Sequence, residues 1–192
     1  METIAIEPRL HLWSKDEYYQ MAEIGFFDDK RVELIEGQVL EMSPMRSGHA
    51  TATMLVAEAL EAILPAEHFL RVQMPLSVSD TSDPEPDVAI VAGAIRDYRD
   101  AHPTTAVLVV EVADSSLDYD RTDKASLYAS AGIADYWVVN LPQRRLEVLR
   151  SPIPDPSQPF GYSYASRTIH SESKRIQPLV AQEAIDVADL LP

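Results

Sequence analysis

The chain has 192 residues, contains no cysteine and carries a formal charge of −15. The absence of cysteine excludes disulfide bonds, thiolate metal sites and a cysteine nucleophile. The acidic balance argues against a nucleic-acid-binding protein, because proteins that bind phosphate backbones usually present a basic surface. No apolar stretch approaches the roughly 20 residues of a membrane span, and the first residues lack the basic-then-apolar pattern of a signal peptide. We therefore expect a cytoplasmic protein that has no contact with membranes.

The first half of the chain predicts two helices and four short strands. Ser14 and Glu17 have the spacing of a capping box, which is typical of a helix start. Apolar residues later recur at helical spacing ahead of Pro65, which ends the second helix. The elements expected in this half are a helix from Ser14 to about Gly25, strands at 31–35 and 38–42 joined by a turn at Glu36-Gly37, a helix at 47–64, and strands at 69–73 and 76–79.

The second half predicts a central strand followed by a crossover helix. The run 106–111 is apolar without alternation, which favours a strand buried on both faces at the centre of a sheet. Because a helix connects it to the strand at 136–139, these two strands should run parallel. The elements expected here are strands at 87–91, 106–111, 136–139, 145–150 and 162–169, helices at 119–131 and 185–190, and loops at 93–105 and 152–159. We interpret residues 1–192 as one domain of mixed α/β class, with a central mixed sheet flanked by helices.

Two acidic residues are placed to meet at one end of this sheet. Asp87 opens one predicted strand and Glu111 closes another, so antiparallel pairing of the two strands would bring the carboxylates close together. Two buried like charges are costly unless a cation joins them. Taken alone, Asp87 could be a turn residue that bonds to the backbone, and Glu111 could be neutralised by a basic side chain. A divalent metal ion and Lys124 are the candidate cations, and together they predict the chemistry of a metal-dependent nuclease.

Lys124 lies on the inward stripe of the helix at 119–131. The residues that share this stripe are Lys124, Leu127, Tyr128 and Ala131. An amphipathic helix packs its apolar stripe on the core, so the lysine must either extend to solvent or meet an acid. Its alternative partner is Asp120, four residues earlier, in an ordinary surface pair. The spacing alone leaves both interpretations open.

Three further features carry weaker signals. Glu33 lies in an alternating strand, which favours a solvated face. His49 shares a helical phase with apolar residues, and an inward histidine is more often hydrogen-bonded in a core than bound to a metal. The stretch 140–175 holds 6 basic residues against 3 acidic ones. It would form a locally basic rim or, as we expect, an ordinary solvated strand face.

Several segments together resemble the Uma-two family of restriction-endonuclease-like proteins, whose fold is similar to that of the PD-(D/E)XK nucleases. The segments are VELIEGQVLEMSP with the following GHA, PEPDVAIV, VLVVEVADSSLDYDRTDKASLYASAGIADYW, VVNL and VADLLP. The resemblance implies that Asp87 and Glu111 are the metal-binding acids and that Glu33 is the acidic residue of the N-terminal region. The superfamily usually places a lysine two residues after the glutamate, but here that position is Ala113. The resemblance implies that Lys124 supplies this ammonium from the helix.

The resulting hypothesis is an endonuclease that hydrolyses phosphodiester bonds, with DNA as the expected substrate. Mg²⁺ or Mn²⁺ would be held by Asp87, Glu111 and the backbone carbonyl of Val112, with water at the remaining positions. Lys124 would orient the attacking water or neutralise the developing charge, and Glu33 would bind a second ion or hold a metal-bound water. Tyr128 would support the lysine.

Two alternatives to this enzyme remain open from the sequence. The first is a nuclease-fold binding or regulatory module without catalytic activity, which the acidic charge and Ala113 favour. The second is an interaction scaffold in which the acids and Lys124 are purely structural. A homodimer is compatible with an endonuclease, because cutting both strands of a duplex usually requires two sites.

Overall fold

A six-stranded mixed sheet forms the centre of the computed structural model, which describes residues 9–192. The strand order is β3-β4-β5-β6-β7-β8. The strands are β3 (His68–Val72), β4 (Val88–Ala92), β5 (Leu108–Ala113), β6 (Asp135–Asn140), β7 (Arg145–Pro154) and β8 (Tyr162–Ser171). Residues 1–8, on which the expected lack of a signal peptide rests, lie outside the described residues.

The pairing of β5 with its two neighbours decides where the predicted site lies. β4 pairs antiparallel with β5, with Val88 opposite Val110, so Asp87 comes next to Glu111 at one end of the sheet. β5 pairs parallel with β6, with Val110 opposite Trp137, and the other strand pairs of this sheet are antiparallel. Every residue of β5 is buried. The predicted mixed α/β class, the central position of this strand and its parallel neighbour are confirmed.

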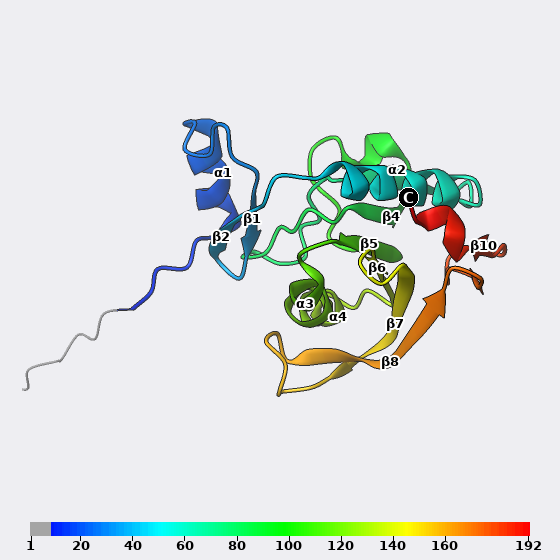
Figure 1. Ribbon diagram of the computed structural model, residues 1–192. Coiled ribbons are helices and arrows are strands. Elements are labelled where there is room, and N and C mark those ends of the chain that lie inside the picture. The colour runs from blue at the N-terminus through cyan, green and yellow to red at the C-terminus, as the bar shows by residue number, and fades with distance from the viewer. Residues whose placement is uncertain (1–8) are drawn as a thin grey trace, which may run out of the picture.

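Helices cover both faces of the sheet (Figure 1). Helix α2 (Ser47–Glu61) packs on one face, where Val56 and Leu60 join the apolar side chains of β4 and β5. The opposite face is covered by one continuous helical segment, in which Tyr128 is fully buried. Its parts are α3 (Leu117–Tyr119), the π-helical turn η2 (Asp120–Lys124) and α4 (Ala125–Ser130). None of the helices within residues 9–192 combines the length and the apolar character of a membrane span.

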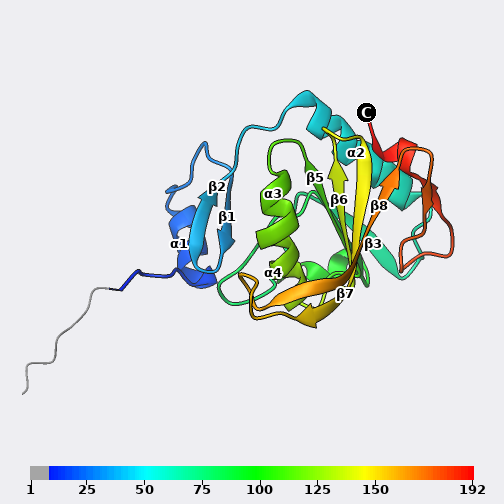
Figure 2. The ribbon, with the colours of Figure 1, turned by 60° about the horizontal axis from the view of Figure 1, so that its bottom comes forward.

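The N-terminal part of the described chain forms a small unit beside the sheet (Figure 2). It consists of α1 (Lys15–Glu23), which the predicted capping box begins, and the hairpin of β1 (Val32–Ile35) and β2 (Gln38–Glu41). The hairpin turn at Glu36 and Gly37 has φ values of 48° and 71°, which glycine adopts without strain. The hairpin is tied to the loop before β4 because the Leu34 carbonyl accepts the Asp83 N–H at 2.8 Å.

Three expected elements differ in the structure. Residues 76–79 form no strand, because the Leu76 and Ser77 N–H groups bond to loop carbonyls instead. The expected loop at 152–159 begins later, since β7 continues through Pro154. Beyond Arg150, β7 pairs with β8 alone. The prolines fit there because their missing N–H groups remove no hydrogen bond to a second neighbouring strand.

The C-terminal helix expected at 185–190 is also only partly present. It begins as strand β10 (Ile185–Asp186), which pairs with β9 (Arg175–Ile176), and continues as the 3₁₀ turn η3 (Val187–Leu190). The expected loop at 93–105 contains one 3₁₀ turn, η1 (Ile95–Tyr98).

Candidate active site

A pocket of about 880 Å³ lies at the sheet end where Asp87 and Glu111 meet. The β1–β2 hairpin, the residues that follow β2, the start of α2, the end of β5 and the α3–η2 segment contribute its walls. The pocket contains the four side chains for which the sequence predicted a catalytic role. They are Glu33, Asp87, Glu111 and Lys124.

The two predicted metal-binding acids contact each other through the backbone. The Asp87 N–H donates to Glu111 Oε2 at 3.3 Å, and the Val112 N–H donates to Asp87 Oδ2 at 2.9 Å. Asp87 is 7% exposed and Glu111 is 6% exposed. The antiparallel strands therefore hold both carboxylates at one buried point, as the sequence predicted.

Asp87 is held as an anion by polar neighbours from two other elements. Its Oδ1 accepts hydrogen bonds from His49 Nε2 at 2.9 Å and from Gln73 Nε2 at 3.0 Å. Burial acts to raise the pKa of Asp87, but these hydrogen bonds and the His49 charge outweigh it and lower the pKa below its usual value. The same bond to Asp87 raises the pKa of His49. His49 is thus an inward, hydrogen-bonded histidine, and its partner belongs to the site.

Lys124 lies between two carboxylates rather than on the surface. Its Nζ is 2.5 Å from Glu33 Oε2 and 3.4 Å from Glu111 Oε1, and the residue is 2% exposed. Burial acts to lower the pKa of Lys124, but the charges of Glu111 and Glu33 outweigh it and hold the pKa well above its usual range. The alternative of a surface pair with Asp120 is wrong, because the ammonium is buried and faces the other two acids.

Glu33 departs most from its sequence pattern. The alternation around it predicted a solvated face, but Glu33 is 2% exposed and bonds to Lys124. Its neighbour Leu34 is fully buried as well, because the strand is covered on both sides. The solvated-face prediction was therefore wrong, since a local pattern does not report which distant segments cover a strand.

Glu111 is the acid that its surroundings neutralise least. Burial raises the pKa of Glu111 to about 8, against the opposing attraction of Lys124. The lysine is closer to Glu33, so it compensates this second carboxylate only in part. The Tyr128 hydroxyl donates to Glu111 Oε1 at 2.7 Å. Tyr128 was expected to support Lys124, but its hydrogen bond goes to Glu111, and its ring centre lies 5.9 Å from the lysine Nζ.

Asp120 is a pocket residue that the sequence did not reveal. It lies in the π-helical turn, is 4% exposed, and accepts a hydrogen bond from the Ser116 hydroxyl at 2.6 Å. Burial raises the pKa of Asp120 to about 6 despite that bond. π-Helical turns are frequent at functional sites, and this one directs both Asp120 and Lys124 into the pocket.

The donor set of this pocket suits a hard divalent cation. Glu33, Asp87, Glu111 and Asp120 are buried acids, whereas Lys124 is the buried cation among them. Within residues 9–192 no group of three or more His, Asp or Glu side chains is arranged so that these side chains alone could hold a metal ion. An ion at this point would therefore rely on two carboxylates, a carbonyl and water, which is the environment that Mg²⁺ commonly accepts.

Comparison with known proteins agrees with this architecture. Residues 15–184 match the family model Uma2, which is described as "Putative restriction endonuclease". The chain belongs to the Uma2 family. A crystal structure of a DUF820 protein from Anabaena variabilis, described as a "putative nuclease", superposes on this Uma2 chain with a TM-score of 0.69, covering 92% of this chain and 96% of that one. The two are 12% identical, so this likeness supports the fold alone. No curated protein matches the chain.

Proposed function

We propose that this Uma2 protein is an endonuclease that hydrolyses phosphodiester bonds in DNA with the help of a divalent metal ion. The observation that carries the proposal is the Lys124 ammonium, which is buried between Glu33 and Glu111 beside Asp87. A buried cation and several buried acids in one open pocket are costly for stability alone, and such groups are typical of catalytic sites. The description of the matched family agrees with a nuclease.

Asp87, Glu111 and the Val112 carbonyl are the groups that would hold Mg²⁺ or Mn²⁺. When bound, such an ion lowers the pKa of a water molecule and stabilises charge on phosphoryl oxygens. The raised pKa of Glu111 fits this assignment, because its burial is compensated only in part within the chain. His49 and Tyr128 orient the two carboxylates through hydrogen bonds of 2.9 Å and 2.7 Å.

Lys124 is the residue that would act on the reacting phosphate. It stays protonated, since two carboxylates raise its pKa, and it presents a fixed positive charge where negative charge develops during phosphodiester hydrolysis. Glu33 positions this ammonium at 2.5 Å. Ala113, at the position where the wider superfamily has a lysine, is fully buried in the apolar layer under α4. The ammonium therefore reaches the pocket from the helix.

A cleavage screen tests the proposal. Purified protein is incubated with single-stranded and duplex DNA and RNA, each with Mg²⁺, Mn²⁺ or EDTA. We expect metal-dependent cleavage of DNA, and loss of activity by at least about a hundredfold in Asp87→Ala, Glu111→Ala and Lys124→Ala. Glu58→Ala, which removes an exposed acid of α2 outside the pocket, should leave the rate unchanged.

The alternative function is a nuclease-fold binding module without catalysis, which the charge of −15 favours. Absence of cleavage under every condition would support that alternative, whereas full activity in all three alanine variants would refute the assigned site. A homodimer would place two pockets on a duplex, and light scattering of the purified protein tests that part. The cytoplasmic location also stays a prediction from the sequence.

A further inference from the structure

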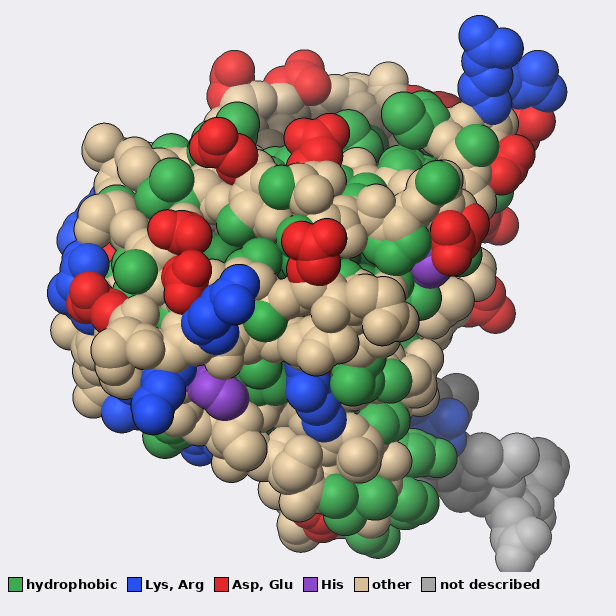
Figure 3. Space-filling view, turned by 90° about the vertical axis from the view of Figure 1, so that its right-hand side faces the viewer, with side chains coloured by type: hydrophobic (Ala, Val, Ile, Leu, Met, Phe, Trp, Pro, Cys, Tyr) green, Lys and Arg blue, Asp and Glu red, His purple; other side chains and the backbone are tan. Residues whose placement is uncertain are grey.

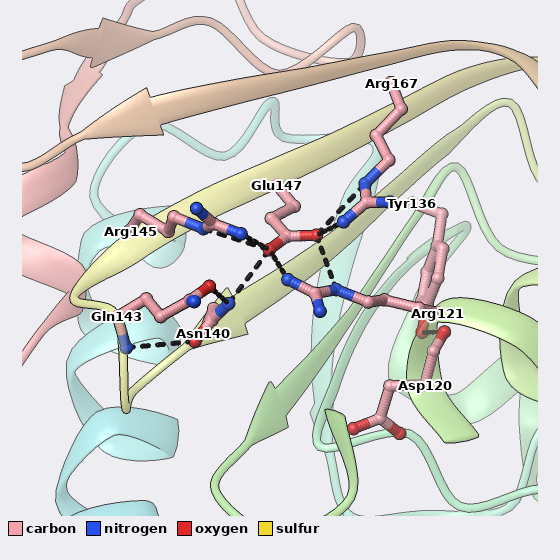
Figure 4. A network of polar contacts seen from close by, with 8 residues as sticks. All are labelled: Asp120, Arg121, Tyr136, Asn140, Gln143, Arg145, Glu147 and Arg167. Atoms are coloured by element: carbon pink, nitrogen blue, oxygen red, sulfur yellow. Dashed lines mark hydrogen bonds and ion pairs between the residues drawn. The ribbon is translucent and has the colours of Figure 1, made fainter. Parts of the chain in front are cut away.

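Three arginines surround one buried carboxylate next to the pocket (Figure 4). Glu147 on β7 has a fully buried side chain. Its Oε2 accepts from Arg121 Nε at 3.0 Å and Arg167 Nε at 3.1 Å, and its Oε1 accepts from Arg145 Nε at 3.2 Å. Asn140 adds a further hydrogen bond to Oε1 at 2.9 Å. The arginines come from η2, β7 and β8, so the fold collects them from distant parts of the chain.

The cluster has more positive than negative groups. The other arginine of these strands, Arg150, pairs with a single carboxylate, that of Asp135, at 2.7 Å. Here three guanidinium groups share one carboxylate, and the exposed Asp118 is the other acid that acts on Arg121. Glu147 balances one of the three positive charges. Two positive charges therefore remain, and Asp118 is the exposed acid that acts on them through Arg121. The stretch 140–175 was expected to form an ordinary solvated strand face, but its Arg145 and Arg167 share one buried carboxylate.

Each guanidinium also retains an unused donor. The three arginines bond to Glu147 through Nε and Nη2, and within residues 9–192 no protein acceptor contacts their Nη1 groups. The side chains of Arg121, Arg145 and Arg167 are 18%, 27% and 43% exposed, so solvent reaches the cluster. Glu147 holds the planar groups in place, which lowers the entropy cost of binding an anion. Arginine binds phosphate oxygens in this forked geometry.

The cluster lies in register with the pocket. Glu111 is opposite Val138, and Val138 is opposite Glu147, so the two glutamates belong to one row across the sheet. With neighbouring strands about 4.8 Å apart, their backbones are roughly 10 Å apart. Asp120 lines the pocket, while the next residue, Arg121, extends to Glu147 (Figure 4). Roughly 10 Å corresponds to the rise of about three base pairs of a duplex.

The acidic charge of the chain is compatible with such a local basic site. Most Asp and Glu side chains on the face in Figure 3 lie in its upper part, toward α2, whereas most Lys and Arg side chains lie in its lower and left parts. The net charge of −15 thus describes the whole molecule and not each surface.

We propose that Arg145 and Arg167, together with Arg121, bind backbone phosphates of a nucleic acid whose reacting phosphodiester lies in the Glu111 pocket. This inference rests on the proposed nuclease function and names the groups that hold its substrate. The surface recognises phosphate charge and spacing, and no base contact is involved.

Salt-dependent binding tests this site without requiring cleavage. The affinity for labelled duplex DNA and for duplex RNA of the same sequence is measured by fluorescence anisotropy in EDTA between 50 and 200 mM salt, about the range over which phosphate contacts are lost. Each phosphate contact to duplex DNA contributes about 0.9 to the slope of log affinity against log salt. Arg145→Gln/Arg167→Gln should reduce the slope by about 1.8, and Arg167→Gln alone by about 0.9.

Two matched variants separate phosphate contact from other effects. Arg96→Gln/Arg99→Gln removes the same charge from exposed residues beyond the opposite end of β4, and should leave the slope unchanged. Arg145→Lys/Arg167→Lys keeps the charge and should retain most of the slope. An effect on the RNA duplex alone would assign the site to an RNA backbone.

The outcomes also separate this inference from the nuclease proposal. An unchanged slope in both glutamine variants, an equal fall in the Arg96/Arg99 control, or no binding of either duplex by the wild type would overturn the phosphate site. Cleavage with an unchanged slope would support the nuclease and reject the phosphate site. A reduced slope in a chain that never cleaves would retain the phosphate site and reject the nuclease.

Discussion

Lys124 is the residue on which the organisation of the pocket depends. Its ammonium is within 4 Å of Glu33 and Glu111, and all three side chains are buried. Removal of one partner from a buried ion pair leaves an uncompensated charge, which costs more than the pair itself contributes. The stability and the proposed chemistry of the site therefore share one side chain.

Lys124→Met is expected to destabilise the protein by about 3 kcal/mol near neutral pH, because it leaves Glu33 buried without its cation. Lys124→Met/Glu33→Gln should recover part of this loss, since the second change removes the unpaired anion. Urea unfolding of the two variants and the wild type measures both effects. A single variant as stable as the wild type would show that the lysine does not compensate the buried acids.

Glu147 makes stability depend on acid pH. Burial acts to raise its pKa, but Arg121, Asn140 and Arg167 outweigh this and lower the pKa to about 2, against 4.5 in an unfolded chain. Because the folded pKa is the lower one, the contribution is complete above about pH 5 and is lost as the pH falls toward 2. Its size is on the order of 3 kcal/mol.

The stability difference between wild type and Glu147→Gln should consequently shrink by about half between pH 5 and pH 3. Urea unfolding at several pH values measures it, and the comparison cancels the titration of other carboxylates. A difference that stays constant over this range would contradict the assigned pKa.

Some of the site residues could be predicted from sequence and others could not. Asp87 directly precedes β4 and Glu111 follows the apolar residues 108–110 of β5, so their proximity follows from the antiparallel pairing of these strands. Glu33 was predicted only through the family resemblance, because the cover over its strand comes from residues far away in the chain. Asp120 was missed as a site residue because a π-helical turn changes the direction of side chains relative to an α-helix.

At the scale of elements, the β1–β2 hairpin carries Glu33 to the pocket and depends on its turn. Gly37 has φ +71°, and a Cβ there would lie 2.6 Å from the Leu12 Cβ and 3.0 Å from the Leu12 Cα. Gly37→Ala should therefore destabilise the protein by about 1–2 kcal/mol from the left-handed backbone alone, and more from the contact.

Gly48 provides the control for this substitution. It lies in α2, and a Cβ there would have nothing within 4 Å. Gly48→Ala should stabilise the protein by up to about 1 kcal/mol, because alanine favours the helix. Thermal or urea unfolding of both variants checks the pair. Equal effects of the two substitutions would mean that the turn does not require its glycine.

Elements with a strong local signal were predicted well. The Ser14 capping box, the hairpin turn and the crossover helix each have residues that favour one structure locally. The errors lie where tertiary pairing decides. Prolines in β7 are tolerated beside a single neighbouring strand, and the 76–79 segment has its N–H groups bonded to loops.

At the scale of the whole molecule, two charged sites lie in one row across the sheet. The Glu111 pocket is acidic with one buried lysine, and the Glu147 cluster is basic with one buried glutamate. Their row across β5, β6 and β7 is set by strand register. Sequence patterns predicted that Asp87 and Glu111 of the first site meet, but the second depends on pairing between segments 20 or more residues apart and was expected to be a solvated face.

Binding of Mn²⁺ by titration calorimetry tests the central claim most directly. The wild type should bind the ion, and Asp87→Asn and Glu111→Gln should each weaken binding by about ten- to a hundredfold. Asp118→Asn, an equal loss of charge outside the pocket, should bind as the wild type does. A wild type that does not bind Mn²⁺, or wild-type affinity in both pocket variants, would contradict the account.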